Sequence, residues 1–293
     1  MEFCSACYSD IGIRKETNQD SLLLMHGVPP QGGEIVLAVL CDGVGGLKMG
    51  ERISAEVVNA FRGWFRNQIM GLCCQQIPMT ALFNDWEHLI QSLHEELKKA
   101  SEAEGFRSGT TVEALLLMNG KYYICHVGDC RTYAITDTIT QLTEDQTIVQ
   151  KELNEGKLTP EQARKDPRQN LLLQCVGAGN EVKPDYLYGD IEPKQMFLVC
   201  CDGFRRRITD GEIQKICRYS FREKKLQHAL EEATELCKSR RETDNITGIL
   251  ISTQEGKNIF SFLRRPSPAP EKGKVNITKD ILLEHSGLMK KND

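Results

Sequence analysis

Short apolar segments separated by polar turns dominate the pattern of the chain. The segments that alternate or run apolar predict strands at residues 3–10, 21–25, 34–41, 110–118, 121–127, 131–135, 194–201 and 246–252. Asn119-Gly120 falls between two of them and is a strong hairpin signal, because Asn and Gly tolerate the positive φ of a tight turn. The pattern therefore predicts a domain rich in strands.

The spacing of apolar residues predicts two pairs of helices. One pair covers about 51–69 and a second helix that starts near Asn84, where Glu87 three residues later completes a capping box. The other pair covers about 210–218 and 223–239. The aromatic residues on these faces are expected in the core; they are Phe61, Trp64, Phe65 and Trp86.

The order of these elements indicates the fold class. Strands come first, then two helices, more strands, two helices and a last strand. Because strands and helices do not alternate, a parallel doubly wound sheet is not favoured. We predict an α+β fold of antiparallel sheets with helix pairs on the outside. Residues 144–180 are polar and are expected to contain helical segments, interrupted at Gly156, Pro160 and Pro167.

The C-terminal stretch differs in composition from the rest. Residues 264–270 are basic and Pro-containing, and Pro resists helix and sheet interiors. We therefore expect a domain over 1–255 and, over 256–293, a Pro-containing basic linker with a short amphipathic tail. The tail could form a helix from about Thr278 that docks on this domain, binds a partner or stays disordered. Removal of 264–293 is expected to leave the sheets intact.

Composition and charge narrow the class of protein. The 293 residues are 40% hydrophobic and 27% charged, as in a soluble globular protein. The net charge is −4, so a nucleic-acid binder is disfavoured. No apolar run approaches the ~20 residues of a membrane span, and the N-terminus lacks a signal-peptide pattern. We expect a cytoplasmic monomer with no membrane span and no nucleic-acid partner.

The 12 cysteines are mostly in apolar runs, as buried reduced thiols are. Cys4 and Cys7 form a CxxC pair, but no second pair follows at zinc-site spacing. A metal or redox role for this pair is weighed against a simple place in the first strand, and the strand is favoured.

Three acidic residues stand at the ends of apolar strands. Asp42 and Asp202 are each followed by Gly, and Asp244 precedes the last strand. Carboxylates at strand ends can converge on a hard cation, although Asp-Gly is also ordinary turn chemistry. Clustered carboxylates repel one another, so a cation or raised pKa values would be needed to hold them together.

Two further segments carry candidate chemistry. Asp129 follows another apolar strand, and the segment 10–20 places cations just before acids, as at a phosphate site beside a metal. No HExxH motif and no thiolate cluster at zinc spacing is present. Oxygen ligands favour Mg²⁺ or Mn²⁺. The residues alone thus indicate an acidic, Mg- or Mn-binding hydrolase or phosphoryl-transfer site.

Eight short motifs lie along the chain. They are Asp10-x-Gly12 through Asn18-Gln19-Asp20, Cys41-Asp42-Gly43-Val44-Gly45-Gly46, Ser108-Gly109-Thr110-Thr111, Val127-Gly128-Asp129-Cys130-Arg131, Leu142-Thr143-Glu144-Asp145, Val176-Gly177, Cys201-Asp202-Gly203 and Thr243-Asp244-Asn245-Ile246-Thr247. Taken together in this order, they resemble the metal-dependent protein Ser/Thr phosphatases of the protein phosphatase 2C type, in their bacterial pattern. The resemblance covers about 3–254.

The resemblance implies a four-layer α/β/β/α sandwich and a set of site residues. Asp42 would bridge two Mn²⁺ or Mg²⁺ ions, and the Gly43 carbonyl would bind one of them. Asp202 and Asp244 would complete the other, and Asp129 would hold a possible third ion. Asp20 would order water at the metals. Residues 144–180 would be a flap beside the site.

The implied activity is hydrolysis of phospho-Ser/Thr in proteins by a metal-bridged water, opposing a Ser/Thr kinase in signalling. No covalent phosphoenzyme is needed, in keeping with the absence of an evident nucleophile dyad. A catalytically weak phosphoprotein-binding scaffold is the alternative, and a regulator dedicated to one phosphoprotein cannot be separated from the general enzyme.

The chain departs from the family pattern in several places. Lys15 stands where Arg usually binds phosphate, with Arg14 just before it, so either could serve. Gln19 replaces a common Glu, which weakens metal binding. Val44 replaces a His of many eukaryotic relatives, so another acid or water must protonate the leaving alkoxide. The basic run 204–207 suggests either a solvated turn or a docking patch for an acidic or phosphorylated protein.

Overall fold

The computed structural model describes residues 1–30, 32–44, 49–74, 79–105, 107–223, 225–254 and 275–284. Its elements in chain order are β1 (Glu2–Asp10), β2 (Asp20–Val28), β3 (Ile35–Val44), α1 (Gly50–Cys74), α2 (Met79–Ala103), β4 (Gly109–Thr110), β5 (Val112–Met118), β6 (Lys121–Val127), β7 (Arg131–Ile135), β8 (Ile139–Gln141), α3 (Ile148–Asn154), α4 (Pro160–Lys165), β9 (Asp185–Asp190), β10 (Met196–Cys200), α5 (Asp202–Arg205), α6 (Asp210–Glu223), α7 (Leu226–Ser239), β11 (Ile246–Gln254) and β12 (Asn276–Leu283).

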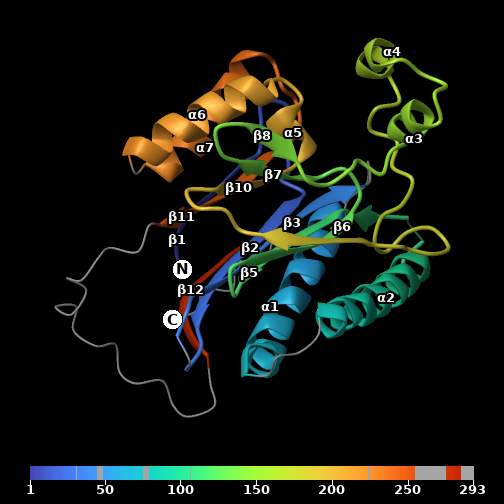
Figure 1. Ribbon diagram of the computed structural model, residues 1–293. Coiled ribbons are helices and arrows are strands. Elements are labelled where there is room, and N and C mark those ends of the chain that lie inside the picture. The colour runs from blue at the N-terminus through green and yellow to red at the C-terminus, as the bar shows by residue number, and fades with distance from the viewer. Residues whose placement is uncertain are drawn as a thin grey trace.

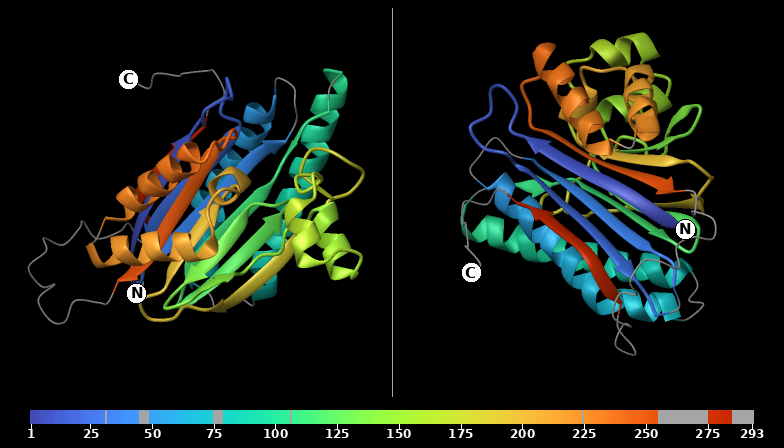
Figure 2. Two further views of the ribbon diagram at one scale, coloured as in Figure 1. Left: turned by 90° about the horizontal axis from the view of Figure 1, so that it is seen from above. Right: turned by 90° about the vertical axis from the view of Figure 1, so that its left-hand side faces the viewer.

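Two antiparallel sheets form the centre of the molecule. One has the order β1-β11-β10-β7-β8, and the other has the order β12-β2-β3-β5-β6-β9, with β4 paired to β3. Helices α6 and α7 cover the outer face of the first sheet, and α1 and α2 cover that of the second (Figures 1 and 2). The expected four-layer α+β sandwich is confirmed.

Strand β3 shows why the apolar runs are continuous rather than alternating. Val36, Ala38 and Leu40 face the core between the sheets, whereas Leu37 and Val39 face the core beneath α1 and α2. Successive side chains of a strand point to opposite faces, so a strand buried on both faces is apolar throughout. The strands form a rigid double layer whose ends can hold polar groups.

The predicted core aromatics lie beneath the helices, as expected. The ring of Trp86 contacts those of Phe61 and Trp64, with centroids 6.1 and 5.5 Å apart. Helix α2 nevertheless starts at Met79, not near Asn84, so the expected capping box is wrong. Leu82 is buried and Phe83 packs on a tyrosine ring, which extends the apolar face by more than a turn.

The hairpin at Asn119-Gly120 is confirmed. Both residues have positive φ, and the flanking β5 and β6 pair antiparallel from Met118 and Lys121. The short β8, the half-exposed β9 and the single-turn α5 had no clear periodic signal and were not predicted.

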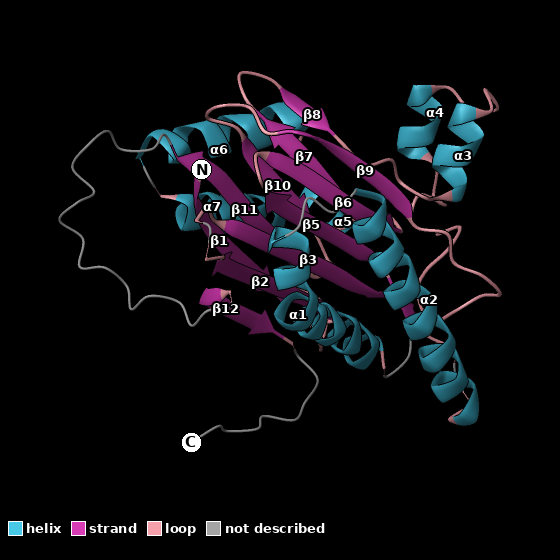
Figure 3. Ribbon diagram, turned by 60° about the horizontal axis from the view of Figure 1, so that its bottom comes forward, coloured by secondary structure: helices cyan, strands magenta, loops and turns pink. Residues whose placement is uncertain are grey.

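The C-terminal tail holds the main correction. A helix from about Thr278 is wrong, because residues 276–283 form β12, antiparallel to β2 (Figure 3). A register shift between Ile277 and Lys279 lets Ile277 and Leu282 pack on the same core. Of the three fates left open, docking on the domain is the one observed for this segment. The stretch 264–274 and the boundary at 255/256 lie outside the described residues, so the boundary stays a prediction.

Two smaller expectations also meet the structure. Cys4 and Cys7 lie in β1, in keeping with the strand interpretation. Among the helices of the described residues, none is long and apolar enough to cross a membrane.

Candidate metal centre

The five candidate carboxylates come from strand ends of both sheets. Asp20 opens β2 and is the register partner of Asp42 near the end of β3. Asp129 follows β6, Asp202 follows β10 at the start of α5, and Asp244 precedes β11. Two antiparallel sheets packed face to face thus present these ends at one edge. We call this group, Asp20, Asp42, Asp129, Asp202 and Asp244, the acid cluster.

Mutual repulsion and burial leave a clear electrostatic signature. Removal from water raises the pKa of Asp42 well above its usual range, and the other four carboxylates raise it further. Burial, with smaller effects of Asp202, raises the pKa of both Asp20 and Asp129 to about 7. Asp20 and Asp129 are only 1% and 5% exposed. Such a cluster is costly without cations, as the sequence suggested.

Buried oxygens in the cluster lack hydrogen bonds. Among the described residues, no donor meets the geometry of a hydrogen bond to either carboxylate oxygen of Asp20 or to Oδ1 of Asp202. Thr247 and Cys201 lie near Asp20 and offset its burial only in part. Because buried polar atoms normally have partners, these oxygens are open to a further ligand.

The donor set fits Mn²⁺ or Mg²⁺ in kind, since it consists of carboxylate oxygens with orphaned lone pairs. These carboxylates are not arranged as the ligands of one ion. Within the described residues, no three His, Cys, Asp or Glu side chains lie close enough together to hold a metal ion. The reason is visible in the contacts of Asp202 and Asp244, both of which pair with cationic side chains.

Arg206 and Arg205 point into the acid cluster. The guanidinium of Arg206 binds Oδ2 of Asp202, and its Nη1 lies 3.1 Å from Oε1 of Glu242 and 3.7 Å from Oδ2 of Asp244. Arg205 donates to the Asp129 carbonyl at 2.8 Å. The interpretation of residues 204–207 as a solvated turn is therefore wrong for these two arginines, which are 20% and 14% exposed, whereas the docking patch stays a prediction.

Lys15 lies at the cluster and Arg14 lies exposed in the same turn. The Lys15 Nζ is 2.7 Å from Oδ1 of Asp244. Burial opposes the charged form, but Asp244, Asp42 and Asp202 outweigh it and raise the pKa of Lys15. Lys15 is thus a fixed positive charge facing the carboxylates.

Two glycines allow three chain segments to meet at the cluster. Gly12 has φ +80°, and a Cβ there would lie 2.1 Å from the Asp244 carbonyl oxygen. A Cβ on Gly203 would lie 2.1 Å from the Asn245 carbonyl oxygen. Real Cβ atoms do not approach so closely, so glycine is required at both positions. Gly43, whose carbonyl is the predicted metal ligand, donates its N–H to the Gln19 carbonyl at 3.1 Å.

Asn245 has a role that sequence reasoning missed. Its Oδ1 accepts from the Gln19 N–H at 2.9 Å, and its Nδ2 donates to the carbonyls of Ile11 and Thr17. One amide therefore ties the loop 11–19 to the start of β11. Position within the Asp244-Asn245 motif was the available signal.

Residues 144–180 lie beside the cluster, as expected of the flap. A cavity of about 520 Å³ is lined by residues of the flap, Asp145 among them, and by Arg131, Arg205 and Arg206 from outside it. Asp145 accepts from Arg131 at 2.6 Å and from Arg205 at 3.0 Å. Burial works to raise the pKa of Asp145, but the two arginines outweigh it and lower it. Residues 144–180 therefore border an arginine-lined cavity next to the carboxylates of the acid cluster.

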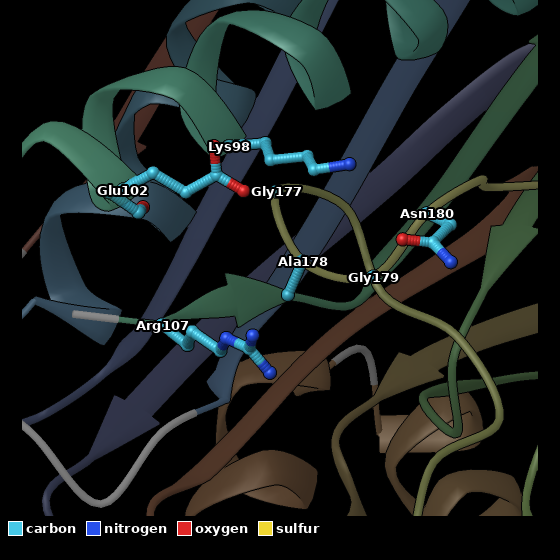
Figure 4. A pocket seen from close by; sticks show the side chains of 8 residues that line it. Lys98, Glu102, Arg107, Gly177, Ala178, Gly179 and Asn180 are labelled. Carbon is cyan, nitrogen blue, oxygen red and sulfur yellow. The ribbon is translucent and has the colours of Figure 1, made fainter. Parts of the chain in front are cut away.

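A smaller cavity of about 110 Å³ lies elsewhere, between the end of α2 and the loop 177–180 (Figure 4). Lys98, Glu102 and Arg107 line it, and no member of the acid cluster does. Charge and burial therefore point to the acid cluster and not to this cavity.

Comparison with known proteins agrees with this geometry. No family model matches the chain. A putative protein phosphatase 2C-type of Streptococcus pyogenes is 29% identical over 252 residues, which cover 84% of this chain and 96% of that protein. The serine/threonine phosphatase of Streptococcus agalactiae has the same fold, with a TM-score of 0.75 and 24% identity over 86% of this chain and all of the other.

The chain is therefore similar in sequence to bacterial phosphatases of the protein phosphatase 2C type and shares the fold of bacterial serine/threonine phosphatases. A second structural relative is the catalytic domain of the serine/threonine protein phosphatase PstP in complex with two manganese ions. It has a TM-score of 0.69 and is 25% identical, over 86% of this chain and 99% of that one. The matches cover 84% of this chain by sequence and 86% by structure.

Proposed function

We propose that this phosphatase 2C-type protein is a Mn²⁺- or Mg²⁺-dependent phosphatase that hydrolyses phosphoserine and phosphothreonine in proteins. The observation that carries the proposal is the acid cluster. Five carboxylates are held at one edge of a rigid double sheet. Burial raises the pKa of Asp20, Asp42, Asp129 and Asp202, and oxygens of Asp20 and Asp202 have no hydrogen-bond donor among the described residues. A chain gains no stability from such an arrangement, so a ligand of opposite charge is its physical rationale.

The residues that would hold two metal ions are Asp42, the Gly43 carbonyl, Asp202 and Asp244, and Asp129 would hold a possible third. Asp42 is the natural bridge, because it faces all four of the other carboxylates. Two bound cations would activate a water molecule and offset the charge on the phosphoryl group. The two manganese ions of the PstP complex support this choice of metal.

The other residues of the site would position the reactants. Asp20 is buried beside Asp42 and would accept a hydrogen bond from water. Lys15 is close to Asp244 and would bind a phosphate oxygen as a point charge, and exposed Arg14 could reach the same group. The arginine-rich cavity under the flap is suited to an anionic substrate.

The substrates would be proteins phosphorylated by a Ser/Thr kinase, which this enzyme would oppose in signalling. The relatives named serine/threonine phosphatases support that substrate class.

The test is turnover of matched phosphopeptides that differ only in phosphoserine, phosphothreonine or phosphotyrosine. With Mn²⁺ present, we expect phosphate release from the first two and at least about tenfold less from phosphotyrosine. Asp42→Asn serves as the inactive control. Binding of the phosphopeptides without release of phosphate would contradict the proposal and favour the scaffold alternative.

A further inference from the structure

We propose that Arg206 is an internal counter-cation that competes with the metal ion for Asp202 and so weakens metal binding. This inference rests on the proposed function, because it takes Asp202 as a metal ligand. It concerns a residue of this chain that stands outside the ligand set.

The contacts of Arg206 place it at the metal ligands. Arg206 directly follows α5, four residues after Asp202, and its backbone N–H donates to the Asp202 carbonyl at 2.9 Å. This turn brings the guanidinium back onto Oδ2 of Asp202. The same guanidinium lies 3.7 Å from Oδ2 of Asp244. One cationic side chain therefore contacts the two carboxylates proposed to complete one metal site.

A guanidinium and a divalent cation cannot share this place. Mn²⁺ or Mg²⁺ would bind a carboxylate oxygen at about 2.0–2.2 Å. A guanidinium nitrogen needs the same lone pairs at about 2.8 Å. Two cations this close also repel, and at a partly buried site the repulsion is weakly screened. Arg206 therefore weakens metal binding through Asp202: at Oδ2 the guanidinium must be displaced, and at the open Oδ1 the metal is repelled by the guanidinium beside it.

Glu242 provides the position to which Arg206 can retreat. Its side chain is fully buried and lies 3.1 Å from Nη1 of Arg206 and 3.3 Å from Nε of Arg207. The Oε1 of Glu242 also accepts from the backbone N–H groups of Thr243 and Asp244. Glu242 is thus fixed in place, and Arg206 can keep this contact when it releases Asp202.

Arg205 does not have the same role. It is held by Asp145 at 3.0 Å and by the Asp129 carbonyl at 2.8 Å, and its distance to the Asp129 carboxylate is 3.8 Å. Arg207 pairs with Glu242 and is 47% exposed. It contacts Glu242 from the other side, so it serves as the matched control.

The test measures Mn²⁺ binding by isothermal titration calorimetry in the full-length protein and in Arg206→Gln, with Arg207→Gln as control. We expect Arg206→Gln to bind Mn²⁺ about tenfold more tightly, as loss of one nearby positive charge predicts. Without added metal its melting temperature should fall by about 2–4 °C, because the carboxylates lose a counter-charge. Arg207→Gln should leave the Mn²⁺ affinity within about twofold.

A second variant guards against misfolding of the first. Arg206→Lys keeps the charge but cannot span Asp202 and Glu242 with one planar group, so its Mn²⁺ affinity should lie between those of wild type and Arg206→Gln. Unchanged or weaker Mn²⁺ binding in both Arg206 variants, with a wild type that binds Mn²⁺ and hydrolyses phosphopeptides, would overturn this inference alone. A wild type that binds no Mn²⁺ would overturn the proposed function together with it.

Discussion

At the scale of single residues, Asp42 is the centre of the electrostatics. Its pKa responds to Asp20, Asp202, Asp129 and Asp244, whereas that of Asp129 responds mainly to burial, Asp202 and Arg205. We expect Asp42→Asn and Asp202→Asn to lower kcat on a phosphopeptide by about a thousandfold or more, since charge stabilisation at such sites supplies several kcal/mol. Asp129→Asn should cost less. Equal losses in all three, with circular dichroism spectra unchanged, would show that this ranking is wrong.

The buried Asp20 predicts how stability depends on pH without added metal. Its folded-state pKa of about 7 lies above the ordinary 3.8, so the folded protein binds the proton more tightly than the unfolded chain. The stabilisation is fully present below pH ~4 and is lost as the pH rises to about 7. Asp20→Asn should flatten this dependence, and thermal unfolding between pH 4 and 8 is the measurement. A wild-type melting temperature that rises steadily up to pH 7, unaltered in the variant, would contradict the assignment.

Gly12 allows a second residue-scale test with a built-in control. Gly12→Ala should destabilise strongly, because Cβ would collide with the Asp244 carbonyl 2.1 Å away. Gly32 has nearly the same φ, +84°, but nothing lies within 4 Å of its Cβ position. Gly32→Ala should therefore cost only about 1 kcal/mol of backbone strain. Denaturant unfolding compares the two, and equal losses would mean that the Gly12 contact carries no weight.

Asp42, Asp129, Asp202 and Asp244 could be proposed from sequence because each lies at an end of an apolar run, whereas Asp20 was proposed from the family resemblance. The place of Arg206 in the cluster could not be predicted, since three arginines after Asp-Gly-Phe are equally typical of a solvated turn. Only the geometry of α5 turns its side chain inward onto Asp202. Asn245 was likewise hidden, because its partners Ile11 and Thr17 are more than 220 residues distant in the chain.

At the scale of elements, β12 is the strand that the sequence pattern assigned to a helix. Its apolar residues fit a helical face until the bulge between Ile277 and Lys279 is known, and a bulge leaves no periodic signal. The long buried strands were predictable because burial on both faces demands unbroken apolar runs. Short edge strands such as β8 carry no such demand.

The pairing of β12 changes the expected effect of truncation. β12 covers the edge of β2 from Leu22 to Val28, and Asp280 pairs with Arg62 and Arg66 of α1. Deletion of 255–293 should therefore expose a strand edge, lower the melting temperature by about 5 °C or more and promote aggregation. The control deletion of 285–293 keeps β12 and should stay within about 2 °C. Scanning fluorimetry and light scattering report both effects, and identical behaviour of the two deletions would contradict the role given to β12.

At the scale of the whole molecule, two sheets act as a rigid frame that forces like charges together. The apolar interiors of the strands are not destabilised by this repulsion, because the carboxylates of the acid cluster lie at the strand ends. Opposite charges come from Arg206 and Lys15 within the chain and, in the proposed function, from metal ions. Metal binding should therefore stabilise the whole fold, since a ligand that binds only the folded state raises its melting temperature.

The most direct measurement of the central claim is the rate of phosphate release from a phosphothreonine peptide as a function of free Mn²⁺, in chelator-treated protein. The account predicts no release above background in chelator, a saturable rise with Mn²⁺, and no rise in Asp42→Asn at any Mn²⁺ concentration. An undiminished rate in excess chelator, or full Mn²⁺-dependent activity in Asp42→Asn, would contradict the assignment of the acid cluster as a metal-dependent phosphatase centre.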